Sequence, residues 1–294
     1  MELTQPSRRL PFSTLALAVA LAGGAATAGC SSQAAAEFLI SPEQENMLGA
    51  QIKLELEKGT AEMPAIKYLP PGELRDYVLG LANKVVSLGK MQRPEFTWNV
   101  EVIDDPNQVN AFATPGGYLY VFTGLLRAAE NEAEVIGVMG HEVAHVLARH
   151  YARRLVQTYT LQGLIAIALG RDAGALSQLA ANILAQGYLL SHSRDAETQA
   201  DEIGARLTSQ AGYDPNGLVT FFAKLEMMQG QVPSFLKYLM GHPPPGDRQK
   251  HVTDLIAREK LPIGATNAPA FLNMRSKLPA GLPMGGGVDG GTRG

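Results

Sequence analysis

The feature that most constrains this chain is the segment His141-Glu142-Val143-Ala144-His145, which lies inside a long apolar run. Asn131, followed three residues later by Glu134, is typical of a helix N-terminus. The apolar pattern then predicts one helix that continues through Val156. At 3.6 residues per turn, the two histidines of the segment share one face of this helix. Because buried histidines need polar partners, the helix must pack around a polar centre.

Two imidazoles one helical turn apart can bind the same zinc ion, each at about 2.0–2.1 Å. Glu142 then lies beside the metal without being a ligand and is placed to act as a general base. The alternative is a surface helix with two incidental histidines, which the apolar neighbours on both sides disfavour. A catalytic zinc needs a third protein ligand and one open position. Since the chain has a single cysteine, Cys30, that ligand must be a histidine or a carboxylate.

The third ligand is expected from the later segment Ser193-Arg194-Asp195-Ala196-Glu197-Thr198-Gln199-Ala200-Asp201, which is predicted to be helical. Glu197 and Asp201 share a face of that helix, because they are four positions apart. Glu197 can bind the zinc, while Asp201 holds a ligand histidine or donates a proton. The residues alone leave Asp195, Asp201 and Glu202 open as alternatives to Glu197.

Together these motifs resemble one family of gluzincin metallopeptidases. The family contains the CAAX prenyl proteases, the HtpX-type proteases, the mitochondrial Oma-type proteases and periplasmic lipoprotein or barrel-assembly proteases. Beyond the His-Glu-x-x-His motif, the resemblance rests on Ser193-Arg194 with Glu197 and Ala200-Asp201, on residues 110–117 and 212–218, and on His242-Pro243 with Arg248. It covers roughly residues 40–260.

The resemblance implies a zinc endopeptidase with one Zn²⁺ per chain. The implied ligands are His141, His145 and Glu197, with Glu142 as the base and Asp201 as the proton donor. The implied fold is a zincin-like metalloprotease domain, α+β and predominantly helical, with a small β-sheet beside the helix that carries the histidines. The closest match is the small periplasmic outer-membrane lipoprotein branch, because the membrane spans and C-terminal repeats of the other branches are not found.

Three further residues near these motifs receive separate predictions. His242 lies in a proline-rich loop and is the candidate fourth ligand. We hypothesise that it occupies the open zinc position in a resting state; the alternative is a loop histidine bonded to the backbone. His150 is expected at the surface, because it stands beside Arg149 and near Arg153. Arg248 is a candidate for stabilising the oxyanion if the His242 loop folds over the zinc.

Three short segments before the histidine helix predict the sheet. Residues 97–103 and 118–122 alternate as strands, and Asn110-Ala111-Phe112-Ala113 is expected to add a third. This third segment resembles the edge strand on which related metallopeptidases pair an extended substrate, through backbone hydrogen bonds that ignore side-chain identity. The alternative is an ordinary core strand. The substrate interpretation predicts broad specificity for unfolded or exposed segments.

The remaining pattern is mostly helical. Capping residues and apolar periodicity predict helices over 42–58, 73–88, 196–211 and 214–230, two pieces within 161–190, and a last helix after Asp247. The predicted metallopeptidase domain is therefore 42–262. Residues 263–294 are predicted to be an extended, Gly-rich tail that is disordered at its end.

The N-terminus predicts the compartment. Arg8 and Arg9 precede an apolar stretch, and small residues lead up to Cys30, so residues 1–29 are predicted to be a signal peptide. Small residues before a cysteine resemble the bacterial lipobox, which implies that Cys30 is lipidated and that residues 30–41 form the lipidated N-terminus and a spacer. By the same resemblance, Ser31 points to the outer membrane. The alternatives are an ordinary secretory signal and an uncleaved anchor.

Charge and motifs together predict the partners. Lys plus Arg number 25 and Asp plus Glu 28, for a net charge of −3 without a long basic run, which excludes nucleic acid as a partner. The predicted function is hydrolysis of misfolded or unassembled cell-envelope proteins by a periplasmic, lipid-anchored enzyme. Its predicted partners are these substrates, the membrane and outer-membrane assembly proteins. The alternative is a chaperone-like or latent periplasmic binding protein with a histidine-capped zinc site.

Overall fold

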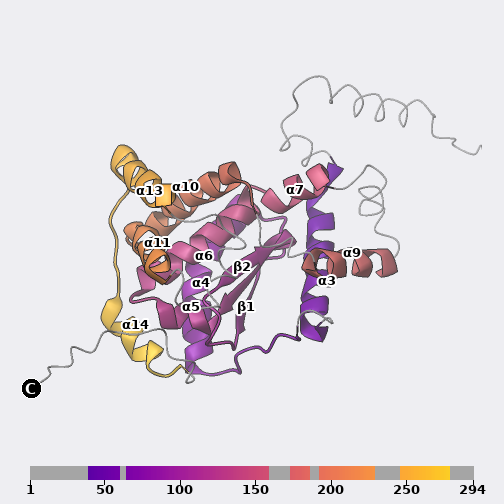
Figure 1. Cartoon of the computed structure of the whole chain (residues 1–294), viewed down its shortest axis with the longest axis horizontal. Helices are drawn as coiled ribbons and strands as arrows, with labels where there is room; N and C mark the ends of the chain where they lie inside the picture. Colours follow the sequence, from indigo (N-terminus) through magenta and orange to yellow (C-terminus); the bar gives the residue numbers. More distant parts are fainter. Residues whose placement is uncertain (1–38, 60–63, 159–172, 186–191, 229–245, 279–294) are drawn as a thin grey trace, which may run out of the picture.

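The computed structural model describes residues 39–59, 64–158, 173–185, 192–228 and 246–278. There, helices surround one small sheet (Figure 1), which confirms the predicted α+β, predominantly helical fold class. The helices are α3 (Pro42–Lys58), α4 (Glu73–Gln92), α5 (Thr123–Ala128), α6 (Glu132–Leu147), α7 (His150–Thr158), α9 (Ala173–Ala185), α10 (Arg194–Gln210), α11 (Asn216–Met228), α13 (Gly246–Glu259) and α14 (Ala268–Arg275). The strands are β1 (Asn99–Ile103), β2 (Ala111–Thr114) and β3 (Tyr118–Phe122).

The sheet has the order β1-β3-β2. β1 pairs with β3 in parallel, and β2 pairs with β3 in antiparallel, with Phe112 opposite Tyr120. The two aromatic rings stack with their centroids 4.7 Å apart. A short 3-10 turn, Pro115–Gly117, joins β2 to β3, and both of its glycines have a positive φ, a conformation that favours glycine. All three predicted strands are confirmed, with β2 displaced by one residue from the predicted segment.

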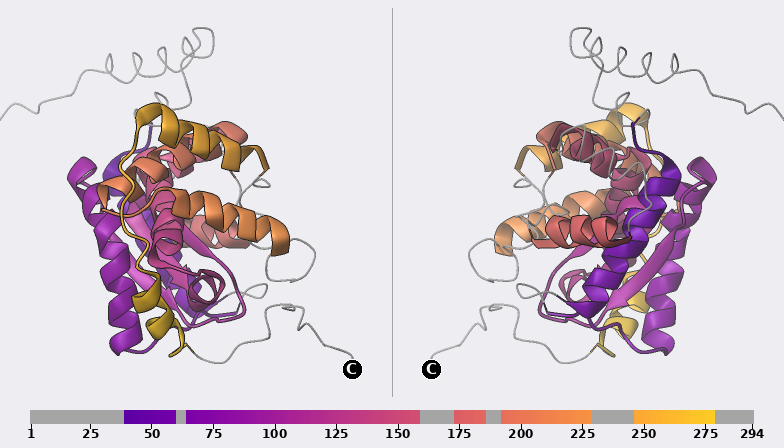
Figure 2. Two further views of the ribbon diagram at one scale, coloured as in Figure 1. Left: turned by 90° about the vertical axis from the view of Figure 1, so that its left-hand side faces the viewer. Right: turned by 90° about the vertical axis from the view of Figure 1, so that its right-hand side faces the viewer.

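Helix α6 is the centre of the fold. Its sequence is apolar nearly all round, and every one of its residues is buried. It packs against β2 and against α4, α10 and α11, and Figures 1 and 2 show it enclosed by these elements. The side chains that α6 carries are therefore held inside the protein and need partners from the surrounding elements.

Local capping signals explain where the predicted helices begin. Before α3, the Ser41 hydroxyl accepts a hydrogen bond from the backbone N–H of Gln44, whose side chain accepts one from Ser41 in return. Before α10, the Ser193 hydroxyl accepts from the N–H of Ala196. These helices start within two residues of the predicted positions, while α4 continues four residues further than predicted.

The predicted single helix through Val156 is wrong, because it breaks after Leu147. Arg149 adopts a φ of 53°, a left-handed conformation that costs a non-glycine residue about 1–3 kcal/mol. Its buried side chain donates from Nε to Glu45 Oε1 at 2.6 Å and from Nη2 to the carbonyl of Ile40. The contact joins α3 to the end of α6 and holds the break in place.

Residues 263–278 are not the extended tail that the sequence predicted. The N–H of Ala265 donates to the carbonyl of Gly212 at 3.0 Å, and its carbonyl accepts from Asp214 at 3.0 Å. Helix α14 then follows, with Phe271 buried in the core. Of the two predicted helices within 161–190, α9 is observed, and residues 159–172 and 186–191 lie outside the described residues.

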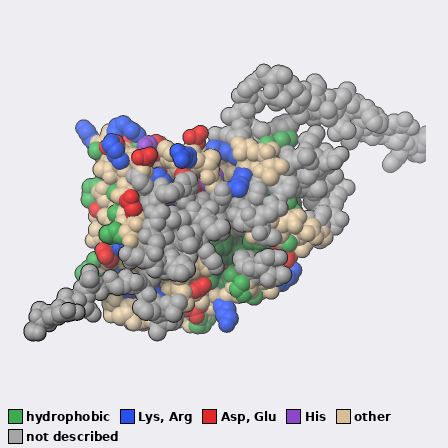
Figure 3. All heavy atoms as spheres, in the orientation of Figure 1, with side chains coloured by type: hydrophobic (Ala, Val, Ile, Leu, Met, Phe, Trp, Pro, Cys, Tyr) green, Lys and Arg blue, Asp and Glu red, His purple; other side chains and the backbone are tan. Residues whose placement is uncertain are grey.

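Charged side chains gather over α13, at the upper left of Figure 3. They include ion pairs along the helix surface, such as Lys250 with Asp254 and Arg258 with Glu259. These side chains are largely exposed to solvent, and ion pairs of this kind add little stability. Of the helices in the described ranges, none combines the length and the apolar character needed to cross a membrane.

Glu45→Gln is expected to lower the free energy of unfolding by about 3–5 kcal/mol, because it leaves the guanidinium of Arg149 buried without its charged partner. Urea denaturation measures this change. The matched control on the same helix is Glu57→Gln, whose partially exposed ion pair with Lys53 contributes under about 1 kcal/mol. Equal losses for the two variants would contradict the prediction.

Candidate metal centre

Close packing of α6 and α10 brings the candidate ligands together. A Cβ added at Gly204 of α10 would lie 2.9 Å from the backbone of His141, and one added at Gly140 would lie 3.1 Å from the carbonyl of Gly204. Only glycines permit this approach of the two backbones. As a result, Glu197, one turn into α10, reaches the histidine face of α6.

Three candidate ligand side chains converge at this point. The Nε2 atoms of His141 and His145 are 3.0 Å apart. Glu197 Oε2 lies 3.5 Å from the first and Glu197 Oε1 lies 3.4 Å from the second. All three side chains are at most 1% exposed. Of the His, Cys, Asp and Glu side chains in the described residues, these form the one group of three that could hold a metal ion.

The donor set fits zinc. Four ligands at 2.0–2.2 Å around a tetrahedral zinc are separated by roughly 3.3 Å. The three separations here, 3.0, 3.4 and 3.5 Å, are close to that value. Two imidazoles and one carboxylate are also the ligands of many catalytic zinc sites, in which a fourth position stays open. The structure therefore brings together the three ligands that the resemblance implied, arranged as in zincins.

Glu142 is buried next to this group, at 1% exposure. Its Oε2 accepts a hydrogen bond of 3.2 Å from the backbone N–H of Ala113 in β2. The carboxylate predicted to act as the base is thus connected to the strand predicted to bind substrate. In the sequence these two residues are separated by a strand, a turn and a short helix, so only the fold shows the contact.

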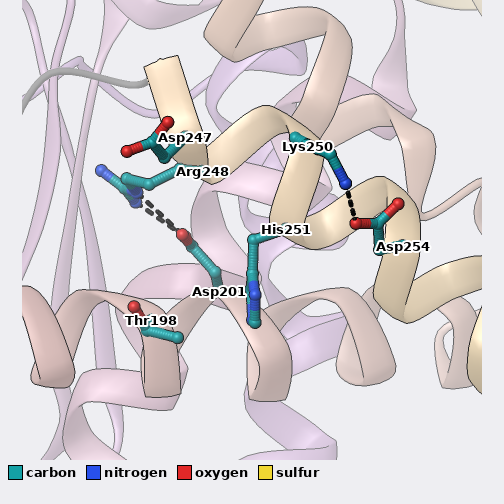
Figure 4. Close-up of a pocket in the computed structure, with 7 residues that line it drawn as sticks. All are labelled: Thr198, Asp201, Asp247, Arg248, Lys250, His251 and Asp254. Carbon is teal, nitrogen blue, oxygen red and sulfur yellow. Dashed lines mark hydrogen bonds and ion pairs between the residues drawn. The ribbon is translucent and has the colours of Figure 1, made fainter.

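Asp201 contacts His141 rather than the centre of the group. Its Oδ1 lies 2.9 Å from His141 Nδ1. On its other side, Arg248 of α13 donates from Nε and Nη2 to the two carboxylate oxygens, each at 2.7 Å (Figure 4). These contacts are those of a residue that orients a ligand histidine, which is one of the two roles that the sequence left open. Proton donation by Asp201 stays a prediction.

Arg248 lies behind the ligands. Besides holding Asp201, its Nη1 is 3.1 Å from Glu197 Oε2, and its guanidinium packs over the ring of Phe222. All three guanidinium nitrogens therefore face the two buried carboxylates. This position suits neutralisation of carboxylate charge. The oxyanion role depended on the loop that carries His242 and stays a prediction. The other candidate, His242, lies outside the described residues, and so does its proposed capping of the zinc.

The expectation that His150 lies at the surface is wrong, since it is 3% exposed. Its Nδ1 lies 2.8 Å from Nδ1 of His145. Five residues along an unbroken helix turn through about 140° relative to the start, which would point the two side chains apart. The break at Arg149 brings them together. His192, which received no role from the sequence, stacks on His145 with ring centroids 3.9 Å apart.

The buried groups shift each other's titration. Burial lowers the pKa of His141, but hydrogen bonds to Asp201 and Glu197 outweigh burial and raise it to about 9. Burial also dominates at His145, whose pKa lies well below its usual value, and lowers the pKa of His150 to about 4. Burial raises the pKa of Asp201, but its hydrogen bonds with Arg248 and His141 bring it below the usual value. Without metal, both ring nitrogens of His141 therefore carry a proton at neutral pH, and the side chain is positively charged.

Zinc binding is expected to release one of these protons. Below pH 9 the metal competes with a proton on His141, so the apparent zinc affinity should rise about tenfold from pH 7 to pH 8 and level off above pH 9. Competition with a chelator of known pH dependence measures the affinity. The same affinity at pH 7 and pH 8 would contradict the prediction.

Comparison with known proteins agrees with this site. The model of peptidase family M48 matches residues 72–256. Mitochondrial metalloendopeptidase OMA1 of Schizosaccharomyces pombe is 33% identical over 185 residues, which cover 63% of this chain and 54% of that protein. The putative beta-barrel assembly-enhancing protease of Vibrio cholerae is 30% identical, over 60% of this chain and 37% of that protein.

The beta-barrel assembly-enhancing protease of Escherichia coli is 27% identical, again over 60% of this chain and 37% of that protein. The chain spans about half the length of the first of these relatives and little more than a third of the other two. The matched residues include the three candidate ligands and Glu142. This chain belongs to peptidase family M48.

Proposed function

We propose that this protein is a zinc endopeptidase that cleaves extended segments of other proteins. The observation that carries the proposal is the hydrogen bond from Ala113 N–H to Glu142, beside the group formed by His141, His145 and Glu197. It places a buried carboxylate, a zinc-type ligand set and β2, an edge strand of the described sheet, at one point. Zinc-dependent hydrolysis of a peptide bond uses a metal site, a base for the attacking water and a surface that positions the substrate.

The residues divide the chemistry between them. Zinc, when bound, would polarise the scissile carbonyl and make a water molecule more acidic. Glu142 takes the proton of the attacking water and passes it to the leaving amine. Asp201 keeps the Nδ1–H of His141 pointed away from the ligand position, and Arg248 keeps Asp201 ionised. His141 can then offer Nε2 as a ligand throughout the reaction.

The geometry of β2 supports strand-like binding of substrate. The N–H of Phe122 in β3 donates to the carbonyl of Asn110, and Phe112 lies opposite Tyr120. Because backbone groups alternate in direction along an antiparallel strand, those of Ala111 and Ala113 point away from β3. Since the Ala113 N–H already donates to Glu142, an added strand would pair with the backbone groups of Ala111 and with the carbonyl of Ala113. An extended substrate pairing there would use only backbone hydrogen bonds, so its sequence would matter little.

The substrate class and compartment complete the proposal. We place the protein in the periplasm, anchored to the outer membrane by lipid on Cys30, where it degrades misfolded or unassembled envelope proteins. The signal-like segment before Cys30 supports the location. The names of two relatives, beta-barrel assembly-enhancing proteases, support a role near outer-membrane assembly and make assembly proteins the expected partners.

Glu142→Gln is expected to reduce cleavage of an unfolded protein by about 10²–10⁴-fold, because the amide cannot accept the proton of the attacking water. The measurement uses zinc-loaded chain beginning at Ser31, with wild type and variant compared at matched zinc content. Glu202→Gln, at a half-buried position of α10 that pairs with Arg206, serves as the control and should cleave at the wild-type rate.

If wild-type protein binds zinc but does not cleave, the endopeptidase proposal fails. That result would favour the second function, a latent or chaperone-like periplasmic protein. Suppression of aggregation of the same unfolded protein, unchanged in Glu142→Gln, would then identify it.

Cys30→Ala is expected to abolish incorporation of labelled palmitate and to move the protein from the membrane to the soluble periplasmic fraction, because the thiol is the proposed site of lipid attachment. Expression in a bacterial host followed by fractionation measures both effects. The control variant Ser32→Ala should remain labelled. Unchanged membrane association of an unlabelled Cys30→Ala protein would instead indicate an uncleaved anchor.

A further inference from the structure

A chain of hydrogen bonds runs outward from His145, away from the candidate metal position. His145 Nδ1 lies 2.8 Å from Nδ1 of His150. Nε2 of His150 lies 3.0 Å from Oε1 of Gln199, and Nη1 of Arg153 donates to the same oxygen at 3.0 Å. This series of hydrogen bonds connects α6, α7 and α10 and ends at Arg153, whose guanidinium is always charged.

The donor and the acceptor of each hydrogen bond in this series follow from Arg153, at its outer end. A guanidinium can only donate, so Gln199 must present its oxygen to Arg153. That same oxygen faces His150 Nε2, which must therefore carry a hydrogen. A neutral imidazole protonated at Nε2 has its lone pair on Nδ1. His150 Nδ1 thus accepts a hydrogen bond from the Nδ1–H of His145.

These hydrogen-bond directions determine which nitrogen of His145 can bind the metal. An Nδ1–H on His145 leaves a lone pair on its Nε2 atom, which lies 3.0 Å from His141 Nε2 and 3.4 Å from Glu197 Oε1. We propose that His150 and Gln199 are positioning residues that hold His145 in the one tautomer and ring orientation able to bind the metal. The inference deepens the proposed function, on which it rests for the identity of the metal as zinc.

The two ligand histidines are thus oriented by different chemistry. His141 faces the ionised pair of Asp201 and Arg248, whereas Nδ1 of His145 faces a neutral imidazole. Two carboxylates, Glu197 and Asp201, are already buried beside one guanidinium. A further carboxylate behind His145 would add an unbalanced buried charge, while an imidazole fixes the tautomer without one.

Helix α10 supplies both orienting contacts together with a ligand. Glu197 joins the metal-binding group, Gln199 fixes His150, and Asp201 fixes His141. Because these residues lie within one helical turn and a half, the position of α10 against α6 sets the ligand and the orientation of both histidines at once. The break at Arg149 is equally necessary, since it turns His150 back toward His145.

The first test needs no substitution. Nitrogen-15 NMR of histidine-labelled, metal-free protein at pH 7.5 reports which ring nitrogen of each histidine carries a hydrogen. We expect His145 to be protonated at Nδ1 only and His150 at Nε2 only. A hydrogen on Nδ1 of His150 would overturn the proposal.

The second test measures zinc affinity by competition with a chelator. Gln199→Leu removes the acceptor oxygen and should weaken zinc binding by about 10–100-fold. Gln199→Glu retains an acceptor oxygen for both Arg153 and His150, and should bind zinc at least as tightly as wild type. The matched control, Gln249→Leu on α13, should not change the affinity.

An affinity of Gln199→Leu within twofold of wild type would overturn the proposal, and so would equal losses in Gln199→Leu and Gln199→Glu, since the acceptor oxygen would then be irrelevant. If Gln199→Leu does not fold, the NMR measurement on wild type decides. Neither readout uses proteolysis. Failure of the endopeptidase proposal, seen as zinc binding without cleavage, is therefore distinguishable from failure of this inference.

Discussion

The close approach of α6 and α10 is the contact on which the rest of the site depends. Gly140 and Gly204 let the two backbones meet where any side chain would force them apart. Helix α6 contributes two histidines and a candidate base, and α10 contributes the third ligand. Because all of these groups are buried, a small change in the separation of the helices would alter both the ligand distances and the hydrogen bonds that orient the histidines.

Burial also means that the charges of the site must be balanced inside the protein. Two carboxylates, Glu197 and Asp201, lie in the interior and are balanced by Arg248 and, in the metal-free protein, by a protonated His141. A divalent cation would take the place of that proton. Helix α13, far along the chain, packs against α10 and brings the guanidinium of Arg248 to these two carboxylates, where its positive charge offsets the cost of burying them.

Strain at one residue, Arg149, links helix α3 to this centre. Arg149 occupies a left-handed conformation and is held there by Glu45 of α3. The resulting break ends α6 and starts α7, which places His150 behind His145. The same residue therefore attaches α3 to the core and creates the orienting contact, and an uninterrupted helix would provide neither.

The sequence by itself determined what depends on local spacing. Helical periodicity placed His141 and His145 on one face, alternation marked the three strands, and motif resemblance selected Glu197 from several nearby carboxylates. The tertiary structure alone decided the break at Arg149, the burial of His150, the pairing of Arg248 with Asp201 and the helix within 268–275. Each of these depends on contacts between residues distant in sequence, whose energies outweigh the local preferences that a sequence pattern records.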